Sequence, residues 1–210
     1  MTIVNNNFKD ILEGRRSIKT YDTSVKISNE EILEMINEAI TAPSSVNFQP
    51  WKFLVVNTPE GKEKLRPLVS FNTTQNDTSS AMIVVLGNVR PQDTAEKIYN
   101  QSVEKGYMPQ EIKDKLFPMY AKMYDSFSME QMREVVKVDA SLAAMQFMLV
   151  ARAHGYDTNA IGGFNTKEIV AALGEDDKKY VPVMIISLGK AAEAGRPSVR
   201  LSAEEVTRFI

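Results

Sequence analysis

Apolar and polar residues follow two different periods along this chain, and each period predicts its own kind of element. From Ser28 to Pro43 apolar residues recur every three or four positions, as in an amphipathic helix with one buried face. Ser28 and Glu31 form the capping-box pair that begins such a helix. Short runs rich in β-branched residues instead predict strands at Trp51–Asn57, Ala81–Asn88 and Val181–Leu188.

A long helix is predicted to begin near Ser128 and to continue to His154. Gln131 stands at the capping-box position relative to Ser128, and Gly155 is a typical helix stop. From Val135 onward the segment is apolar nearly all round. Because every apolar face needs a cover, we expect both the domain core and a second subunit to pack against this helix.

Capping and breaking signals predict several shorter elements. Asparagines precede Phe8–Glu13 and Gly14 follows it, which indicates a first short helix. Thr58-Pro59 resembles a helix start between the first two strands. Further predicted pieces are helices at Asp93–Lys105 and Pro109–Asp125, an extended piece ending at Ile161, a helix from Thr166 and a last helical turn from Ser202.

The chain shows no low-complexity linker, block of like charges or repeat, so we treat residues 1–210 as one domain. Helices alternate with a few strands, but the connections are irregular. No Gly-x-Gly-x-x-Gly follows a strand, which argues against a dinucleotide-binding Rossmann unit. The pattern therefore favours the α+β class, with helices around a central sheet.

Composition narrows the chemistry that the chain's own side chains can perform. With 25 basic and 27 acidic side chains the net charge is −2, which argues against a nucleic-acid-binding or polybasic membrane-binding surface. Cysteine is absent and His154 is the single histidine, which makes thiolate chemistry, histidine metal sites and catalytic triads improbable. An enzyme of this composition would borrow a cofactor. The N-terminus lacks the features of a secretory signal, so we expect a cytoplasmic protein.

Three short segments could carry chemistry, and each also has a plain structural interpretation. Arg15–Lys19 places three cations and a hydroxyl within five residues, which suits a phosphate but also fits a solvated basic turn. Ala42–Trp51 presents polar side chains on a frame fixed by two prolines, which suits a flat polar heterocycle or merely separates a helix from a strand. Asn159–Phe164 contains two glycines that let backbone N–H groups approach a ligand, or that form an ordinary turn.

Together, and in this order, these segments resemble the FMN-dependent nitroreductase family over almost the whole chain. Arg-Arg-Ser-Ile-Lys-Thr-Tyr-Asp at 15–22 is similar to the family's phosphate-binding motif, and Pro-Ser-Ser-x-Asn-x-Gln-Pro-Trp at 43–51 is similar to its flavin-facing loop. The resemblance continues at Phe71-Asn72, at Ile161–Phe164 and at Gly195–Arg200. It implies a three-layer α-β-α fold, with a mostly antiparallel central sheet flanked by helices, in an intertwined homodimer.

The resemblance also implies a role for each matching residue. Arg15, Arg16, Ser17 and Arg200 would hold the FMN phosphate. Lys19, Asn72 and Gln75 would lie near the flavin ring, and the turn Ile161, Gly162, Gly163 would offer backbone N–H groups near N5 and O4. Pro43, Ser44, Ser45 and Asn47 would meet the FMN of the partner subunit, because the family's site lies at the dimer interface. The implied catalytic residues are Lys19 and Gly162, and no metal is implied.

Three positions depart from the pattern of some members of the family. Ser198 and Gln75 stand where those members have lysines near the phosphate and near flavin N1 and O2. Asp139 stands where they have glutamine, which leaves its contribution to the ring pocket open. Electrostatic support for a reduced flavin would therefore depend more heavily on Lys19.

The resemblance implies an enzyme that passes a hydride from NADH or NADPH through flavin N5 to a small electrophilic acceptor, such as a nitroaromatic compound or a quinone, by a ping-pong mechanism. A helical insertion at about 93–127 would act as a lid over the substrate. Flavin or enone reduction on the same scaffold, a flavin-binding sensor or storage protein, and a purely structural homodimer are the alternatives. Neither a nucleic acid nor a membrane is expected as a partner.

Overall fold

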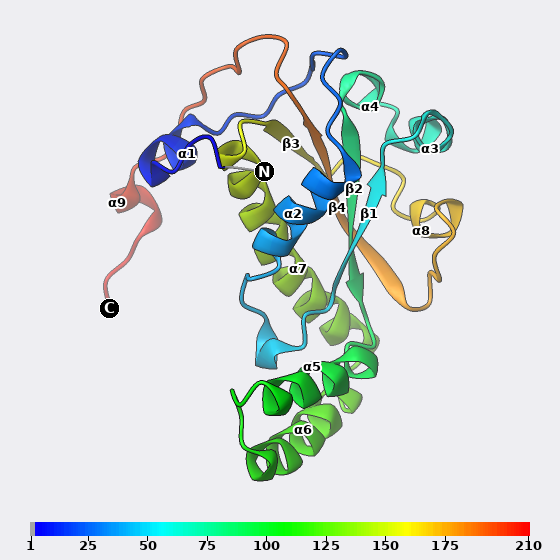
Figure 1. Ribbon diagram of the computed structural model, residues 1–210, viewed down its shortest axis with the longest axis vertical. Helices are drawn as coiled ribbons and strands as arrows, with labels where there is room; N and C mark the ends of the chain where they lie inside the picture. The colour runs from blue at the N-terminus through cyan, green and yellow to red at the C-terminus, as the bar shows by residue number, and fades with distance from the viewer. Residues whose placement is uncertain (1–2) are drawn as a thin grey trace.

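The computed structural model, which describes residues 3–210, is built around a four-stranded sheet with helices on both of its faces (Figure 1). The strands lie in the order β1-β2-β4-β3, and every neighbouring pair is antiparallel. They are β1 (Trp51–Val56), β2 (Ala81–Asn88), β3 (Asp157–Ile161) and β4 (Tyr180–Gly189). The predicted α+β class with three layers and an antiparallel central sheet is therefore confirmed.

Most helices begin and end where the capping signals predict. The helices are α1 (Phe8–Gly14), α2 (Asn29–Ala39), α3 (Pro59–Leu65), α4 (Thr73–Thr78), α5 (Gln92–Glu104), α6 (Gln110–Asp125), α7 (Met129–Ala153), α8 (Ile169–Ala172) and α9 (Ala203–Val206), with 3-10 turns at Ser45–Asn47 and Arg66–Val69. Helix α4 was not predicted, because its sequence, TTQNDT, has no apolar position from which a period could be read. Helix α8 is shorter than the helix predicted from Thr166, since residues 166–168 form a turn and Gly174 adopts a left-handed φ soon afterwards.

The two predicted capping boxes differ in the structure. At α7 the box is complete, because Ser128 N–H donates to Gln131 Oε1 and Gln131 N–H donates to Ser128 Oγ. At α2 only the Ser28 half forms, and the Glu31 carboxylate is used elsewhere: it accepts a hydrogen bond of 2.9 Å from the Tyr156 hydroxyl. That bond ties α2 to the chain that follows α7.

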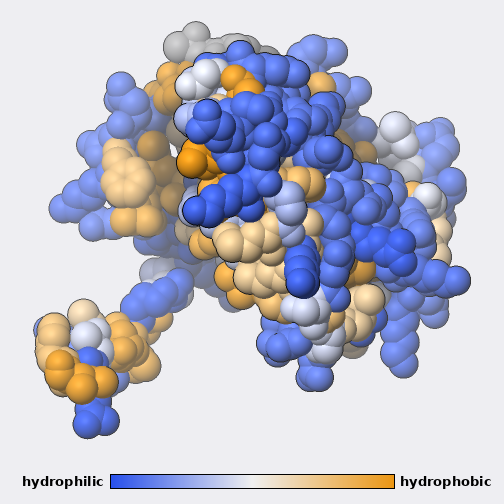
Figure 2. Space-filling model, turned by 90° about the horizontal axis from the view of Figure 1, so that it is seen from below, coloured by the Kyte–Doolittle hydropathy of each residue, from blue (hydrophilic) through white to orange (hydrophobic). Residues whose placement is uncertain are grey.

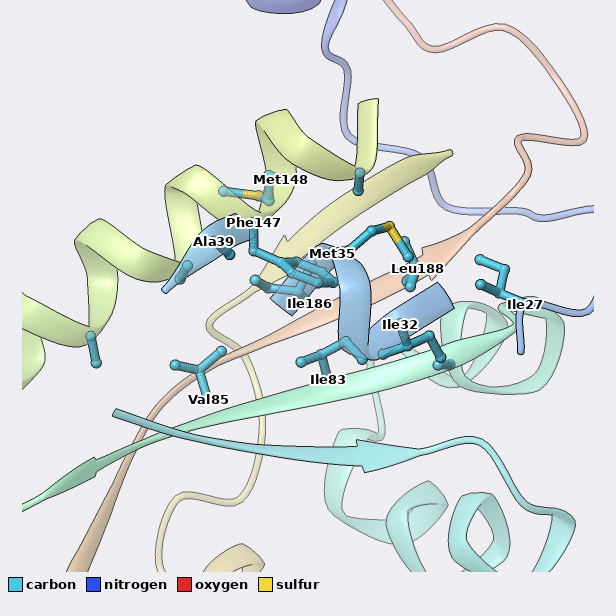
Figure 3. Close-up of a cluster of buried hydrophobic side chains, with 14 residues drawn as sticks. Ile27, Ile32, Met35, Ala39, Ile83, Val85, Phe147, Met148, Ile186 and Leu188 are labelled. Atoms are coloured by element: carbon cyan, nitrogen blue, oxygen red, sulfur yellow. The ribbon is translucent and has the colours of Figure 1, made fainter. Parts of the chain in front are cut away.

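Alternate residues of β2 pack into two separate hydrophobic cores, one on each face of the sheet. Ile83 and Val85 of β2 pack with α2 and α7 on one face, around the fully buried Phe147 (Figure 3). Met82 and Val84 point to the other face, where α3 and α8 cover them. Each large apolar side chain so buried stabilises the fold by about 1.5–3 kcal/mol. The three layers therefore follow from the burial of β2 on both of its faces.

Helices α5 and α6 pack against each other at one end of the molecule, beyond the end of the sheet (Figure 1). Their contact with the rest of the chain is a third core that contains Phe48, Tyr99, Tyr124 and Val136. These two helices occupy the segment in which the sequence predicts a lid, so we refer to α5 and α6 as the lid helices.

The segment after β4 leaves the body of the molecule. It first runs beside residues 20–22, where Ala192 N–H donates to Thr20 O at 3.1 Å, and it then projects into solvent with α9. Figure 2 shows this end as a separate projection that carries apolar side chains. Phe209 is 95% exposed. Within residues 3–210, no helix combines the length and the apolar character that crossing a membrane requires.

Candidate functional site

A cleft of about 430 Å³ lies between the first predicted phosphate motif and the segment after β4. Backbone hydrogen bonds fix one wall, since Ile18 N–H donates to Thr158 O at 3.1 Å and Asp22 N–H donates to Lys190 O at 2.8 Å. The cleft is lined by Arg15, Arg16, Ser17, Ile18, Lys19, Glu193, Ala194, Gly195, Arg196, Pro197, Ser198 and Arg200. The two segments, from opposite ends of the sequence, are thus brought together as the resemblance implies.

Gly195 allows the two walls of this cleft to touch. A Cβ atom at this position would lie 2.3 Å from Cβ of Arg16, far inside any tolerated contact. The atom in the way belongs to the base of the arginine side chain, which cannot swing aside. Only glycine therefore lets the chain after β4 pass this close to Arg16.

The cleft is strongly positive although the whole chain carries a net charge of −2. Its lining holds five cations and one carboxylate, Glu193, and none of the five forms an ion pair among the residues that the structure describes. Backbone contacts orient two of them: Arg16 donates to the carbonyl groups of Glu13 and Arg15, and Arg200 donates to Val199 O and to Ser198 Oγ. Guanidinium groups held in this way bind phosphate oxygens in pairs, so the donor set fits a phosphate dianion.

A second group of predicted residues meets at the turn after β3. Asn72 Nδ2 donates to Gly163 O at 3.0 Å, and Gln75 Nε2 donates to Asn72 Oδ1 at 3.0 Å. Gln75 is only 3% exposed, whereas Gly162 and Gly163 are exposed. No atom lies within 4 Å of a Cβ built at Gly162. The turn therefore presents open backbone beside an oriented amide, and Ile161 anchors it from the buried end of β3.

The predicted flavin-facing loop lies elsewhere. Residues 43–50 follow α2 and pack beside the lid helices, at the end of the molecule away from the segment that contains Arg15 (Figure 1). Pro43, Ser45 and Asn47 are exposed, and Ser44 is half-buried. One chain therefore does not bring this loop to its own cleft.

This loop has an unusual backbone. Val46, Asn47 and Gln49 have φ angles of 47°, 57° and 48°, in the left-handed region that residues with a Cβ avoid. Conformations of this kind cost roughly 1–3 kcal/mol each, and they persist where the surrounding structure enforces them. Here Gln49 N–H donates to Ser44 Oγ at 3.0 Å, and Ser45 N–H donates to Asp139 Oδ1 at 3.1 Å.

Asp139, whose role the sequence leaves open, lies directly behind the loop. Burial raises the pKa of its carboxyl group, and the Ser45 N–H lowers that pKa in part. His154 has no part in either cluster. Its Nε2 lies 3.2 Å from the Glu38 carboxylate, so it joins the end of α7 to α2.

Comparison with known proteins gives one consistent result. Residues 12–190 match the model of the nitroreductase family. YdgI of Bacillus subtilis, a protein assigned as an NAD(P)H nitroreductase, is 50% identical over 207 residues, which cover 99% of both chains. The CLA biosynthesis enone reductase of Lactiplantibacillus plantarum is 37% identical over 209 residues, which cover 99% of this chain and 96% of the relative.

Solved structures agree with the sequence comparison. A crystal structure from Exiguobacterium sibiricum, of a protein assigned as a nitroreductase in complex with FMN, superposes with a TM-score of 0.96 at 48% identity and covers 100% of both chains. The chain therefore belongs to the nitroreductase family and is an FMN-dependent NAD(P)H oxidoreductase.

Proposed function

We propose that this enzyme carries reducing equivalents from NADH or NADPH to nitroaromatic, quinone or related electrophilic acceptors, by a ping-pong mechanism. The observation that carries the proposal is the positive cleft, whose five cations form no ion pair within residues 3–210 and which lies on the same chain as the open turn at Gly162 and Gly163. The site of action is the cytoplasm, where the nicotinamide reductants are supplied.

Arg15, Arg16, Ser17 and Arg200 hold the FMN phosphate in this proposal. All four line the cleft, and backbone carbonyl groups orient Arg16 and Arg200. Charge-assisted hydrogen bonds to phosphate are about twice as strong as neutral ones. The cleft volume lies within the range of about 300–1,000 Å³ that is usual for ligand pockets.

The remaining residues position the ring. Bound FMN supplies hydride transfer at N5, which no side chain of this protein can perform. The Gly162 backbone N–H would orient N5, and Lys19 would place a positive charge near N1 and O2, where negative charge develops on reduction. Asn72, which Gln75 and Gly163 hold in place, would face the ring edge, and Ile161 and Gly163 would complete the turn.

The complete site needs two copies of the chain, because Pro43, Ser44, Ser45 and Asn47 would come from the partner. This homodimer is supported by the position of the loop, which lies away from its own cleft (Figure 1). It is also supported by α7, on which Val138, Leu142 and Met145 form an exposed apolar stripe at helical spacing. Val138 is 62% exposed.

A steady-state panel tests the proposed reaction. We expect the purified, flavin-loaded enzyme to reduce a nitroaromatic compound and a quinone with NADH or NADPH, and to give parallel double-reciprocal plots. An enone belongs in the panel because one relative carries the name of an enone reductase. Flavin that neither nicotinamide can reduce would indicate a sensor or storage protein. A colourless protein that takes up no FMN would indicate a structural dimer.

Two substitutions at Gly162 isolate the contribution of its backbone N–H to flavin reduction. Gly162→Ala keeps the N–H, and it fits because the position is open and its φ lies outside the left-handed region. Gly162→Pro removes the N–H, so we expect flavin reduction by NADPH to slow about two- to tenfold, as for the loss of one hydrogen bond. Stopped-flow absorbance at matched FMN content measures this difference. Equal rates in the two variants would rule out the proposed role of the N–H.

A further inference from the structure

The loop at residues 43–50 is tied to the lid helices by contacts that FMN binding alone does not require. The Tyr99 hydroxyl of α5 donates to Val46 O at 3.0 Å. Phe48, which is 0% exposed, lies at the centre of an aromatic cluster, with its ring 4.7 Å from that of Tyr124 of α6 and 6.1 Å from that of Tyr99. The loop and both lid helices therefore share one small core.

Asp139 of α7 makes the second connection, and it does so with a buried carboxyl group. The side chain is 4% exposed, Oδ1 accepts the Ser45 N–H, and Oδ2 has no partner among the described residues. A carboxyl group buried without a cation is costly, so a residue of this kind is not explained by packing. Burial raises the pKa of the Tyr124 hydroxyl, the Ser45 side chain lowers this pKa, and the nearby Asp139 carboxyl group raises it. The phenol of lid helix α6 therefore interacts electrostatically with both Ser45 and Asp139.

The strained part of the loop begins at these two connections. Ser45 is held by Asp139, Val46 by Tyr99, and the left-handed residues begin at Val46. A strained backbone relaxes to another shape when its restraints are released. The shape that the loop offers to a ligand therefore depends on where α5 and α7 hold it.

We propose that Asp139 and Tyr99 are positioning residues that latch this loop to α7 and to the lid helix α5, so that the flavin contact of the loop and the position of the lid change together. The inference rests on the proposed function, in which the loop meets the partner subunit's flavin. Coupling between two binding events is reciprocal. FMN binding should therefore order the lid helices, and an acceptor held by the lid should tighten the loop around the flavin.

Two variants test the latch, with a third as control. Tyr99→Phe and Asp139→Ala should raise the Kd for FMN about fivefold and at least tenfold, respectively, in the folded dimer. Tyr156→Phe removes one tyrosine hydrogen bond of similar length, to Glu31, away from the loop. It should leave the Kd unchanged. The Kd is measured by flavin fluorescence during titration of the apoprotein.

Hydrogen exchange separates the latch from a merely structural effect. In the unmodified protein, added FMN should protect residues 92–125 as well as residues 15–19. Tyr99→Phe and Asp139→Ala should lose the first protection and keep the second. Asp139→Asn keeps an acceptor for the Ser45 N–H, so it should restore both the affinity and the protection.

The outcomes are distinct. Normal FMN affinity in both variants, or a raised Kd with residues 92–125 still protected, overturns the latch. If Asp139→Ala does not fold, Tyr99→Phe and Asp139→Asn decide by the same two measurements. If the unmodified protein binds no FMN, the proposed function fails instead of the latch.

Discussion

Arg15→Glu and Arg200→Glu variants are expected to purify as folded protein without bound FMN. Both side chains line the positive cleft, from opposite ends of the sequence. Each reversal replaces a charge-assisted hydrogen bond, worth about 1.5–3 kcal/mol, by repulsion of the phosphate. Flavin content per subunit, taken from the absorbance spectrum of the purified protein, measures the loss.

The matched control is Arg90→Glu, because Arg90 is exposed and lies outside the cleft. It undergoes the same change of charge, so a general electrostatic effect would appear in it as well. We expect Arg90→Glu to retain its FMN. Full loading of both cleft variants would show that the phosphate lies elsewhere.

Leu142→Glu should produce monomers that have lost FMN. Leu142 is exposed in one chain and lies in the apolar stripe of α7, between Val138 and Met145. An unpaired charge at a buried interface costs several kcal/mol, which corresponds to a weakening of at least about a hundredfold. Size-exclusion chromatography with flavin detection follows both quantities at once.

Leu142→Ala is the control for this experiment, since it removes apolar surface without adding a charge. It should weaken the dimer only slightly and keep the flavin. A stable Leu142→Glu monomer that retains FMN would contradict the assignment of Ser44, Ser45 and Asn47 to the partner's cofactor.

Local signals in the sequence were sufficient to predict those helices and strands whose ends are fixed by neighbouring residues. The Ser128–Gln131 box and Gly155 locate both ends of α7, because capping bonds form within a few residues of each end. The β-branched run at residues 81–88 locates β2. The strand order β1-β2-β4-β3 carries no such signal, because it depends on packing between segments far apart in the chain.

The candidate site likewise has parts that the sequence predicts and parts that depend on contacts between distant residues. The motifs at 15–22 and 195–200 carry the donors of the cleft, and the structure brings them together, but the roles of these residues stay predictions until FMN binding is measured. The strain at Val46 could not be predicted, because a β-branched residue normally excludes the left-handed region. The hydrogen bond that Asp139 accepts from Ser45 could not be predicted either, because the two residues are 94 positions apart in the sequence.

The close approach of Gly195 to Arg16 also sets the order in which the two walls of the cleft are made. The cleft needs residues 15–19 and 193–200, so its second wall is synthesised about 175 residues after its first. The sheet can form once β4 has been made, before that wall has emerged from the ribosome. A complete set of phosphate donors therefore exists only after all four strands of the sheet are present, which places the assembly of this cleft after the assembly of the sheet in the order of synthesis.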